Sequence, residues 1–179
     1  MSTRLVVLDR DGVINHDSED YIRSPAQWRP IRGSLEAIAR LRKAGWRVAV
    51  ATNQAGVGRG LFDMATLAAI HATMSRAVAQ AGGHLDAVFF CPHAPAADCG
   101  CRKPRPGMLH EIARRFAVDP AAMIMIGDSL RDLQAAEAAG CQPVLVLTGN
   151  GRATLREGGL PPSTRVRTDL AAAVRDLLP

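Results

Sequence analysis

The sequence is poor in aromatic residues and has no long hydrophobic run. Aromatic residues make up 4% of the chain, which disfavours a protein that binds single-stranded nucleic acid by base stacking. No apolar run approaches the roughly 18 residues of a membrane-spanning helix, and the N-terminus has no signal-peptide pattern. Only four cysteines are present, and in a reducing compartment metal binding is a better use for them than disulfides. We therefore expect a cytoplasmic protein with no membrane partner.

The composition is otherwise that of an ordinary globular protein. Hydrophobic residues make up 47% and charged residues 22% of the 179 residues, which suits one domain over residues 1–179. The net charge of +5 suits anionic substrates, but the basic residues are scattered along the chain rather than clustered. We expect a monomer that binds a small phosphorylated molecule and no nucleic acid.

Five short apolar runs alternate with helical patterns along the chain. The runs lie at residues 5–8, 48–51, 87–90, 123–126 and 144–147. The helical patterns lie at residues 34–45, 63–82, 106–116, 129–140 and 168–177, with Ser34, Asp63, Ser129 and Thr168 as N-caps. This alternation predicts an α/β fold of the Rossmann-like type, with a mostly parallel sheet and helices on both faces. Residues 15–33 and 91–107 fit neither element, and such long loops are usually functional.

Two carboxylates, Asp9 and Asp11, come directly after the first predicted strand. Ligands of open α/β sheets bind at the carboxyl ends of the strands. Because the chain can turn at Gly12, both side chains can face one small volume. One carboxylate there could attack a substrate while the other transfers a proton. A single Asp-x-Asp-Gly sequence can also be no more than a turn.

Three further polar motifs follow other predicted strands. They are Thr52-Asn53-Gln54, Arg102-Lys103-Pro104 and Gly127-Asp128-Ser129-Leu130-Arg131-Asp132. Each alone has a plain explanation: Thr52 could end a strand, Lys103 could be a surface charge, and Asp128 could cap a helix. Together with the acid pair, and in this order, they resemble the haloacid dehalogenase superfamily of phosphatases over nearly the whole chain.

The resemblance implies hydrolysis of a phosphate ester through an aspartyl-phosphate intermediate. It makes Asp9 the nucleophile and Asp11 the general acid and base. A carboxylate that approaches a phosphate dianion is repelled, so a hard divalent cation is needed between them. The resemblance implies Mg²⁺, bound by the Asp9 carboxylate, the Asp11 backbone carbonyl and Asp128. It also implies that Thr52 and Lys103 bind the phosphoryl oxygens.

A loop at about residues 91–107 carries a second candidate metal site. Its residues of metal-binding type are Cys91, His93, Cys99 and Cys101. Three thiolates and one imidazole make a closed tetrahedral Zn²⁺ site, which is structural rather than catalytic. The loop has little apolar content, so zinc would set its shape and fix Arg102 and Lys103. The alternatives are reduced thiols with a surface histidine, or a strained disulfide between Cys99 and Cys101.

An insert of this kind in an acid-pair phosphatase resembles two groups of the superfamily. One group acts on heptose bisphosphates and the other on histidinol phosphate. The loop at residues 52–60 is closer to the first group, which implies removal of the 7-phosphate of a sugar bisphosphate in the supply of ADP-heptose for lipopolysaccharide. Histidinol phosphate remains the alternative. A 3′-end phosphatase and a zinc-dependent nucleic-acid module are remote alternatives, since acids at a binding face repel polyanions.

Specificity is expected to lie in the loops, because no large inserted domain separates the motifs and a capless site is predicted. The expected substrate-binding residues are polar side chains of these loops: Asp17, Asp20, Asn53, Arg59 and Arg102. Guanidinium groups suit a second phosphate, and the acidic loop suits sugar hydroxyls or an ammonium group. Asp132, one helical turn beyond Asp128, is expected to orient Lys103 or a metal-bound water. Ser129 stands where some heptose relatives have a lysine.

Overall fold

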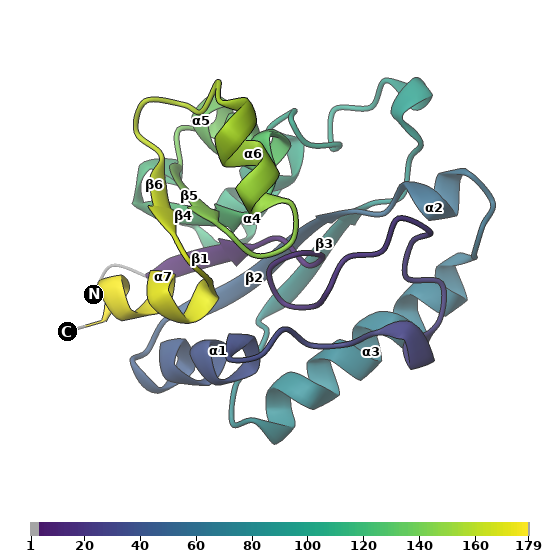
Figure 1. The fold of residues 1–179 in the computed structure, drawn as a ribbon, viewed down its shortest axis with the longest axis horizontal. Coiled ribbons are helices and arrows are strands. Elements are labelled where there is room, and N and C mark those ends of the chain that lie inside the picture. The colour runs from purple at the N-terminus through teal and green to yellow at the C-terminus, as the bar shows by residue number, and fades with distance from the viewer. Residues whose placement is uncertain (1–3, 179) are drawn as a thin grey trace.

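The computed structural model describes residues 4–178, which form one parallel sheet covered by helices on both faces (Figure 1). The strands are β1 (Leu5–Leu8), β2 (Arg47–Asn53), β3 (Ala87–Cys91), β4 (Met123–Gly127), β5 (Gln142–Val146) and β6 (Arg165–Arg167). Their order in the sheet is β3-β2-β1-β4-β5-β6, and every neighbouring pair is parallel. The predicted fold class is confirmed.

The helices divide between the two faces of the sheet. On one face lie α1 (Ser34–Lys43), α3 (Met64–Gln80) and α7 (Leu170–Leu177), and on the other lie α4 (Gly107–Phe116) and α5 (Leu130–Ala139). Alternate strand residues supply both cores: Val6 and Leu8 belong to the first, and Leu5 and Val7 to the second. Every residue of β1 is therefore buried, as expected of a central strand in a parallel sheet.

The predicted N-caps are right for α3 and wrong for α1. Asp63 caps α3 by accepting a hydrogen bond from the backbone N–H of Thr66 at 2.7 Å. The cap of α1 is Gly33, which has a φ of 85°, a left-handed conformation that glycine adopts readily. Ser34 instead donates its hydroxyl to the carbonyl of Val13 at 2.7 Å, so it fastens the helix to the loop after β1.

The predicted cap of α7 is also wrong by one residue. Asp169, not Thr168, accepts a hydrogen bond from the backbone N–H of Ala172 at 2.7 Å. Three short elements were not predicted: β6, α2 (Ala55–Gly58) and α6 (Gly151–Glu157). Three 3₁₀ helices, at Pro25–Gln27, Pro95–Ala97 and Pro120–Ala122, were not predicted either.

The strand order places a ligand-binding crevice beside β1. In the sheet, β2 and then β3 lie on one side of β1, whereas β4, β5 and β6 lie on the other side. The carboxyl ends of β1, β2 and β4 therefore meet where the winding direction changes, a common position for ligand sites. Within the described chain, the loops at residues 9–33 and 92–106 contain one 3₁₀ helix each, so the fold is capless as predicted. No described helix is both long and apolar enough to span a bilayer.

Candidate active site

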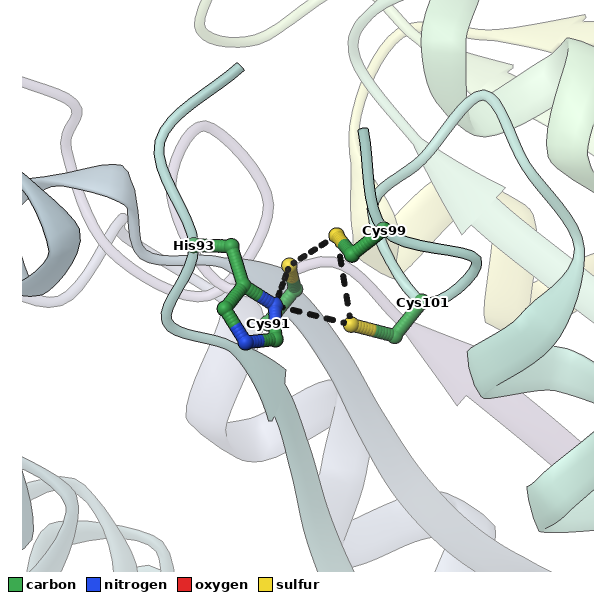
Figure 2. Close-up of side chains that lie close together, drawn as sticks. All are labelled: Cys91, His93, Cys99 and Cys101. Atoms are coloured by element: carbon green, nitrogen blue, oxygen red, sulfur yellow. Dashed lines mark hydrogen bonds between the residues drawn. The ribbon is translucent and has the colours of Figure 1, made fainter. Parts of the chain in front are cut away.

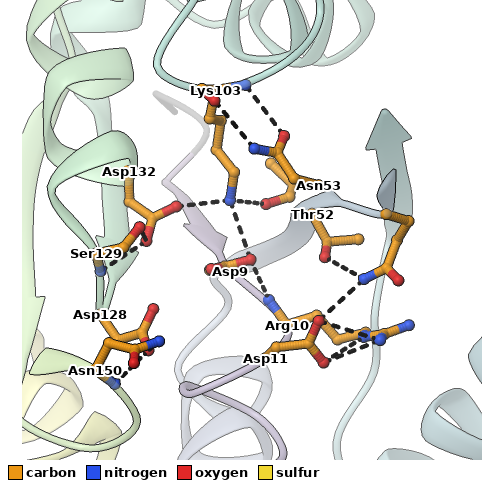
Figure 3. A network of polar contacts seen from close by, with 12 residues as sticks. Asp9, Arg10, Asp11, Thr52, Asn53, Lys103, Asp128, Ser129, Asp132 and Asn150 are labelled. Atoms are coloured by element: carbon orange, nitrogen blue, oxygen red, sulfur yellow. Dashed lines mark hydrogen bonds and ion pairs between the residues drawn. The ribbon is translucent and has the colours of Figure 1, made fainter. Parts of the chain in front are cut away.

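Three carboxylates and one lysine meet at the carboxyl ends of β1 and β4 (Figure 3). Asp9 follows β1, Asp128 follows β4, and Asp132 lies in the first turn of α5. A carboxylate oxygen of each lies within 4.8 Å of the others. The ammonium group of Lys103 lies 3.0 Å from Oδ1 of Asp9 and 2.6 Å from Oδ1 of Asp132. One cation thus pairs with two of the three acids.

Burial and mutual repulsion change how readily these acids ionise. Burial, and then the neighbouring Asp132, raise the pKa of Asp9 well above its usual range, although Lys103 lowers it. The same two causes, burial first, raise the pKa of Asp128 to about 7. If all three acids ionise, the cluster therefore holds more negative charge than Lys103 balances. Oxygen ligands with excess negative charge are the donor set that Mg²⁺ binds, so the residues present fit this ion.

Lys103 is fixed in place by its backbone as well as by its ammonium group. Its side chain is 2% exposed, and Nζ donates to the carbonyl of Ala51 at 2.7 Å. The side chain of Asn53 accepts from the backbone N–H of Lys103 at 3.1 Å and donates to its carbonyl at 3.0 Å. Burial lowers the pKa of Lys103, but Asp132 and Asp9 outweigh this effect and the pKa is raised. Lys103 is therefore a permanent cation of the site.

Asp11 is held by donors from three side chains. Arg10 donates to Oδ1 from Nε at 2.9 Å and to Oδ2 from Nη2 at 3.1 Å. Asn15 donates to Oδ1 at 2.9 Å, and Gln54 donates to Oδ2 at 3.0 Å. Each carboxylate oxygen thus has two donors, so the orientation of the side chain is strongly defined.

Two glycines let the backbone approach Asp128 closely. A Cβ atom would lie 2.0 Å from Oδ2 of Asp128 at Gly12 and 2.2 Å from it at Gly149, where φ is 81° and 54°. The backbone N–H of Asn150 donates to the same oxygen at 2.8 Å, and the hydroxyl of Thr154 donates to the carbonyl of Asp128 at 2.9 Å. Only glycine fits at positions 12 and 149, and the close packing there fixes Asp128 beside Asp9.

The four residues of the second candidate metal site converge as predicted (Figure 2). Sγ of Cys99 lies 3.5 Å from Sγ of both Cys91 and Cys101, and Nδ1 of His93 lies 3.6 and 3.4 Å from Sγ of Cys91 and Cys101. A tetrahedral zinc ion with Zn–S of about 2.3 Å and Zn–N of about 2.0 Å requires S···S edges of about 3.8 Å and S···N edges of about 3.5 Å. The cluster therefore has the size and the donors of a Zn²⁺ site.

Comparisons with known proteins agree with this geometry. A family model described as HAD-hydrolase-like matches residues 100–173. D-glycero-beta-D-manno-heptose-1,7-bisphosphate 7-phosphatases are 60% identical in Bordetella bronchiseptica, over 98% of both chains, and 52% identical in Pseudomonas aeruginosa, over 99% of both. The crystal structure of the B. bronchiseptica D,D-heptose 1,7-bisphosphate phosphatase, complexed with magnesium and phosphate, matches with a TM-score of 0.96 and 59% identity over 98% of both chains.

The chain belongs to the haloacid dehalogenase-like phosphatases. The pocket of this phosphatase has a volume of about 210 Å³. Seven of the residues predicted for the site line it: Asp9, Asp11, Asp17, Asn53, Arg102, Lys103 and Asp128. Three do not, namely Thr52, Asp20 and Arg59. Thr52 is 1% exposed, and its hydroxyl accepts a hydrogen bond from Gln54 at 2.9 Å.

Several residues that line the pocket of the phosphatase are not among the predicted site residues, although some of them stand in the motifs described above. They are Ser18, Tyr21, Ala55, Ser129, Arg131 and Asn150. Asn150 follows β5, and its carboxyl-end position could have suggested it. Tyr21 has a φ of 64°, a left-handed conformation that is rare for an aromatic residue, and nothing in the local sequence indicates it.

Proposed function

We propose that this phosphatase removes the 7-phosphate of D-glycero-β-D-manno-heptose 1,7-bisphosphate. The observation that carries the proposal is the 60% identity to the B. bronchiseptica enzyme over 98% of both chains. The presence of the acid cluster and Lys103 in the pocket supports it. The reaction would supply ADP-heptose for the lipopolysaccharide core. The pocket of about 210 Å³ is compatible with a small sugar phosphate.

In this proposal Asp9 attacks the phosphorus atom and becomes an aspartyl phosphate. Its contact with Lys103 at 3.0 Å keeps the carboxylate oriented and offsets part of the repulsion from the phosphate. Asp11 protonates the sugar oxygen as it leaves, and then takes a proton from the water that hydrolyses the aspartyl phosphate. Splitting the reaction in this way replaces one difficult step with two easier ones.

Mg²⁺ would be held by the Asp9 and Asp128 carboxylates and the backbone carbonyl of Asp11. When bound, the ion neutralises charge between the carboxylate and the phosphate. The excess negative charge of the acid cluster supports this assignment, as does the magnesium found with the B. bronchiseptica relative. Asp132 accepts from Lys103 and from the N–H and hydroxyl of Ser129, at 3.0 and 2.8 Å. Asp132 therefore orients the lysine in this proposal.

The second phosphate would bind to Arg102. This side chain lines the pocket, and its buried Nη1 atom makes no hydrogen bond within residues 4–178. Burial and the nearby Arg131 lower the pKa of Arg102, which indicates two cationic groups close together. A phosphate would satisfy the free donor and relieve this repulsion. The proposed ligands of the transferred phosphoryl group are Lys103 and Thr52. Thr52 lies outside the pocket lining, but its hydroxyl only accepts from Gln54 and so keeps a proton that it can donate to a phosphoryl oxygen.

A comparison of substrates tests this function. We expect kcat/KM for the heptose bisphosphate to exceed that for histidinol phosphate by at least about 100-fold, since charge-assisted hydrogen bonds contribute about 1.5–3 kcal/mol each. Arg102→Ala should lower kcat/KM for the heptose bisphosphate by about 10- to 100-fold and kcat/KM for histidinol phosphate, which has one phosphate, by less than about threefold. The matched control is Arg114→Ala on the surface of α4. A preference for histidinol phosphate would contradict the proposed substrate.

We also propose that the four-residue cluster of Cys91, His93, Cys99 and Cys101 binds structural Zn²⁺. The observed edges of 3.4–3.6 Å support it, and so does a loop of little apolar content between the ligands. The backbone carbonyl of Cys91 accepts from the N–H of Gln54 at 2.8 Å, and the side chain of Gln54 donates to Asp11, so the cluster is linked to the active site through Gln54. Thiolate ligands of this kind persist in a reducing compartment, and we propose a cytoplasmic location.

Cys99→Ser is expected to lower the zinc content of the purified protein from about one ion per chain to well below half. Removing one of four ligands leaves an incomplete tetrahedron, and the loop that carries Lys103 should loosen. Cys141→Ser is the matched control, because Cys141 lies in the hydrophobic core that α4 and α5 form with the sheet and is not one of the four residues of the cluster. Metal analysis of both variants checks the expectation, and an unchanged zinc content in Cys99→Ser would contradict it.

A further inference from the structure

Arg10, the residue between the two acids, has a fully buried side chain that bridges two parts of the fold. Its exposure is 0%, and a buried guanidinium is tolerated only when its donors find acceptors. Nε and Nη2 donate to Asp11, and Nη1 lies 3.2 Å from Nε2 of His71 in helix α3. Arg10 therefore joins the loop after β1 to a helix that contributes no residue to the pocket.

His71 accepts the hydrogen bond from Arg10. Arginine can only donate, so Nε2 must be the acceptor and the proton of the neutral imidazole must lie on Nδ1. Burial, and then the charge of Arg10, lower the pKa of His71 to about 4, which agrees with a neutral ring at physiological pH. The ring also lies 5.8 Å from that of Phe90 in β3, measured between centroids. These contacts fix the acceptor in one place.

Arg10 contributes more to the orientation of Asp11 than any other residue. It supplies two of the four hydrogen bonds to the carboxylate, while Asn15 and Gln54 supply one each. A guanidinium that binds both oxygens through two nitrogens is planar and rigid, so it also sets the plane of the carboxylate. The plane of Arg10 depends in turn on its third nitrogen, whose side-chain partner is His71.

We propose that His71 is a positioning residue for proton transfer, which orients the Asp11 carboxylate through Arg10. The inference rests on the proposed function, in which Asp11 protonates the leaving sugar oxygen. Without the acceptor on α3, the buried Nη1 group of Arg10 has to turn toward another partner, and the carboxylate turns with it. Proton transfer needs an acid within hydrogen-bond reach of the leaving atom, so a small rotation slows the reaction.

Two esters with different leaving groups test the inference. A sugar alkoxide leaves only with a proton, whereas p-nitrophenolate leaves without one. We expect His71→Leu to lower kcat/KM for the heptose bisphosphate by about 10- to 100-fold, a large part of the usual contribution of a general acid, and that for p-nitrophenyl phosphate by less than about threefold. His71→Gln retains an acceptor oxygen and should stay within about threefold of the wild type for both esters.

The comparison distinguishes positioning from a loss of folded protein. Misfolding would lower both values of kcat/KM by the same factor, and such an equal loss in His71→Leu would overturn the inference. So would full activity of this variant on the heptose ester. Asp11→Asn is measured in parallel: if it shows the selective loss and His71→Leu does not, only the role of His71 is wrong. If Asp11→Asn affects both esters equally, the proposed role of Asp11 fails as well.

Discussion

Asp9→Asn is expected to lower kcat for the heptose bisphosphate by more than about 10⁴-fold, because an amide cannot form the aspartyl phosphate and the loss of a nucleophile removes most of the rate. The variant should still fold. Burial already opposes the negative charge of Asp9, and Lys103 keeps its contacts with Asp132 and the carbonyl of Ala51. The fold and the activity are thus separable at this position.

Acid quenching during turnover of a substrate labelled in the 7-phosphate measures the aspartyl phosphate directly, as label carried by the protein. The wild type should carry label on the protein, and Asp9→Asn should carry none. The matched control is Asp63→Asn, because asparagine is also a good N-cap and α3 would keep its first hydrogen bond. Label on the Asp9→Asn protein, or a loss of less than about tenfold in kcat, would exclude Asp9 as the nucleophile.

Much of the acid cluster could be predicted because its positions follow from the strands. Buried parallel strands are continuous apolar runs, and their carboxyl ends meet at one edge of the sheet. Asp9 and Asp128 each follow such a run, so their proximity could be predicted without a structure. Lys103 follows a loop rather than a strand. In the sequence only the family resemblance indicates its role, and its burial between Asp9 and Asp132 depends on the tertiary structure.

The buried bridge from Asp11 through Arg10 to His71 could not be predicted. The sequence places Arg10 next to two acids, where a solvated ion pair is the simplest expectation. Its partner His71 is 61 residues away along the chain and lies in α3, where no motif in the sequence marks it as a site residue. Burial of a charge depends on which helix covers the loop after β1, and that is a property of the tertiary structure. The surroundings of Thr52 could not be predicted either. Its position near the end of a strand is as expected, but its hydroxyl is buried against Gln54.

Asp128→Asn is expected to abolish activity and the response to Mg²⁺, and yet to stabilise the metal-free protein. An acid whose pKa is raised by folding destabilises the fold at every pH above its unfolded pKa, and the effect is complete once the pH passes the folded pKa. For Asp128 the pKa rises from 3.8 to about 7, so the penalty is greatest above neutral pH. Asparagine removes the charge and can still accept from the N–H of Asn150, which lies at 2.8 Å from Asp128.

Melting temperatures with and without Mg²⁺ check both halves of this expectation. After dialysis to remove Mg²⁺, which leaves tightly bound zinc in place, the variant should melt at least about 4 °C above the wild type near pH 8, and the difference should shrink near pH 5. Added Mg²⁺ should raise the melting temperature of the wild type alone, since a ligand stabilises only the state that binds it. Asp119→Asn, on the surface before β4, should change neither value. A variant that still responds to Mg²⁺ would exclude Asp128 as a ligand, and one that melts lower near pH 8 would mean that Lys103 already compensates the charge of the cluster.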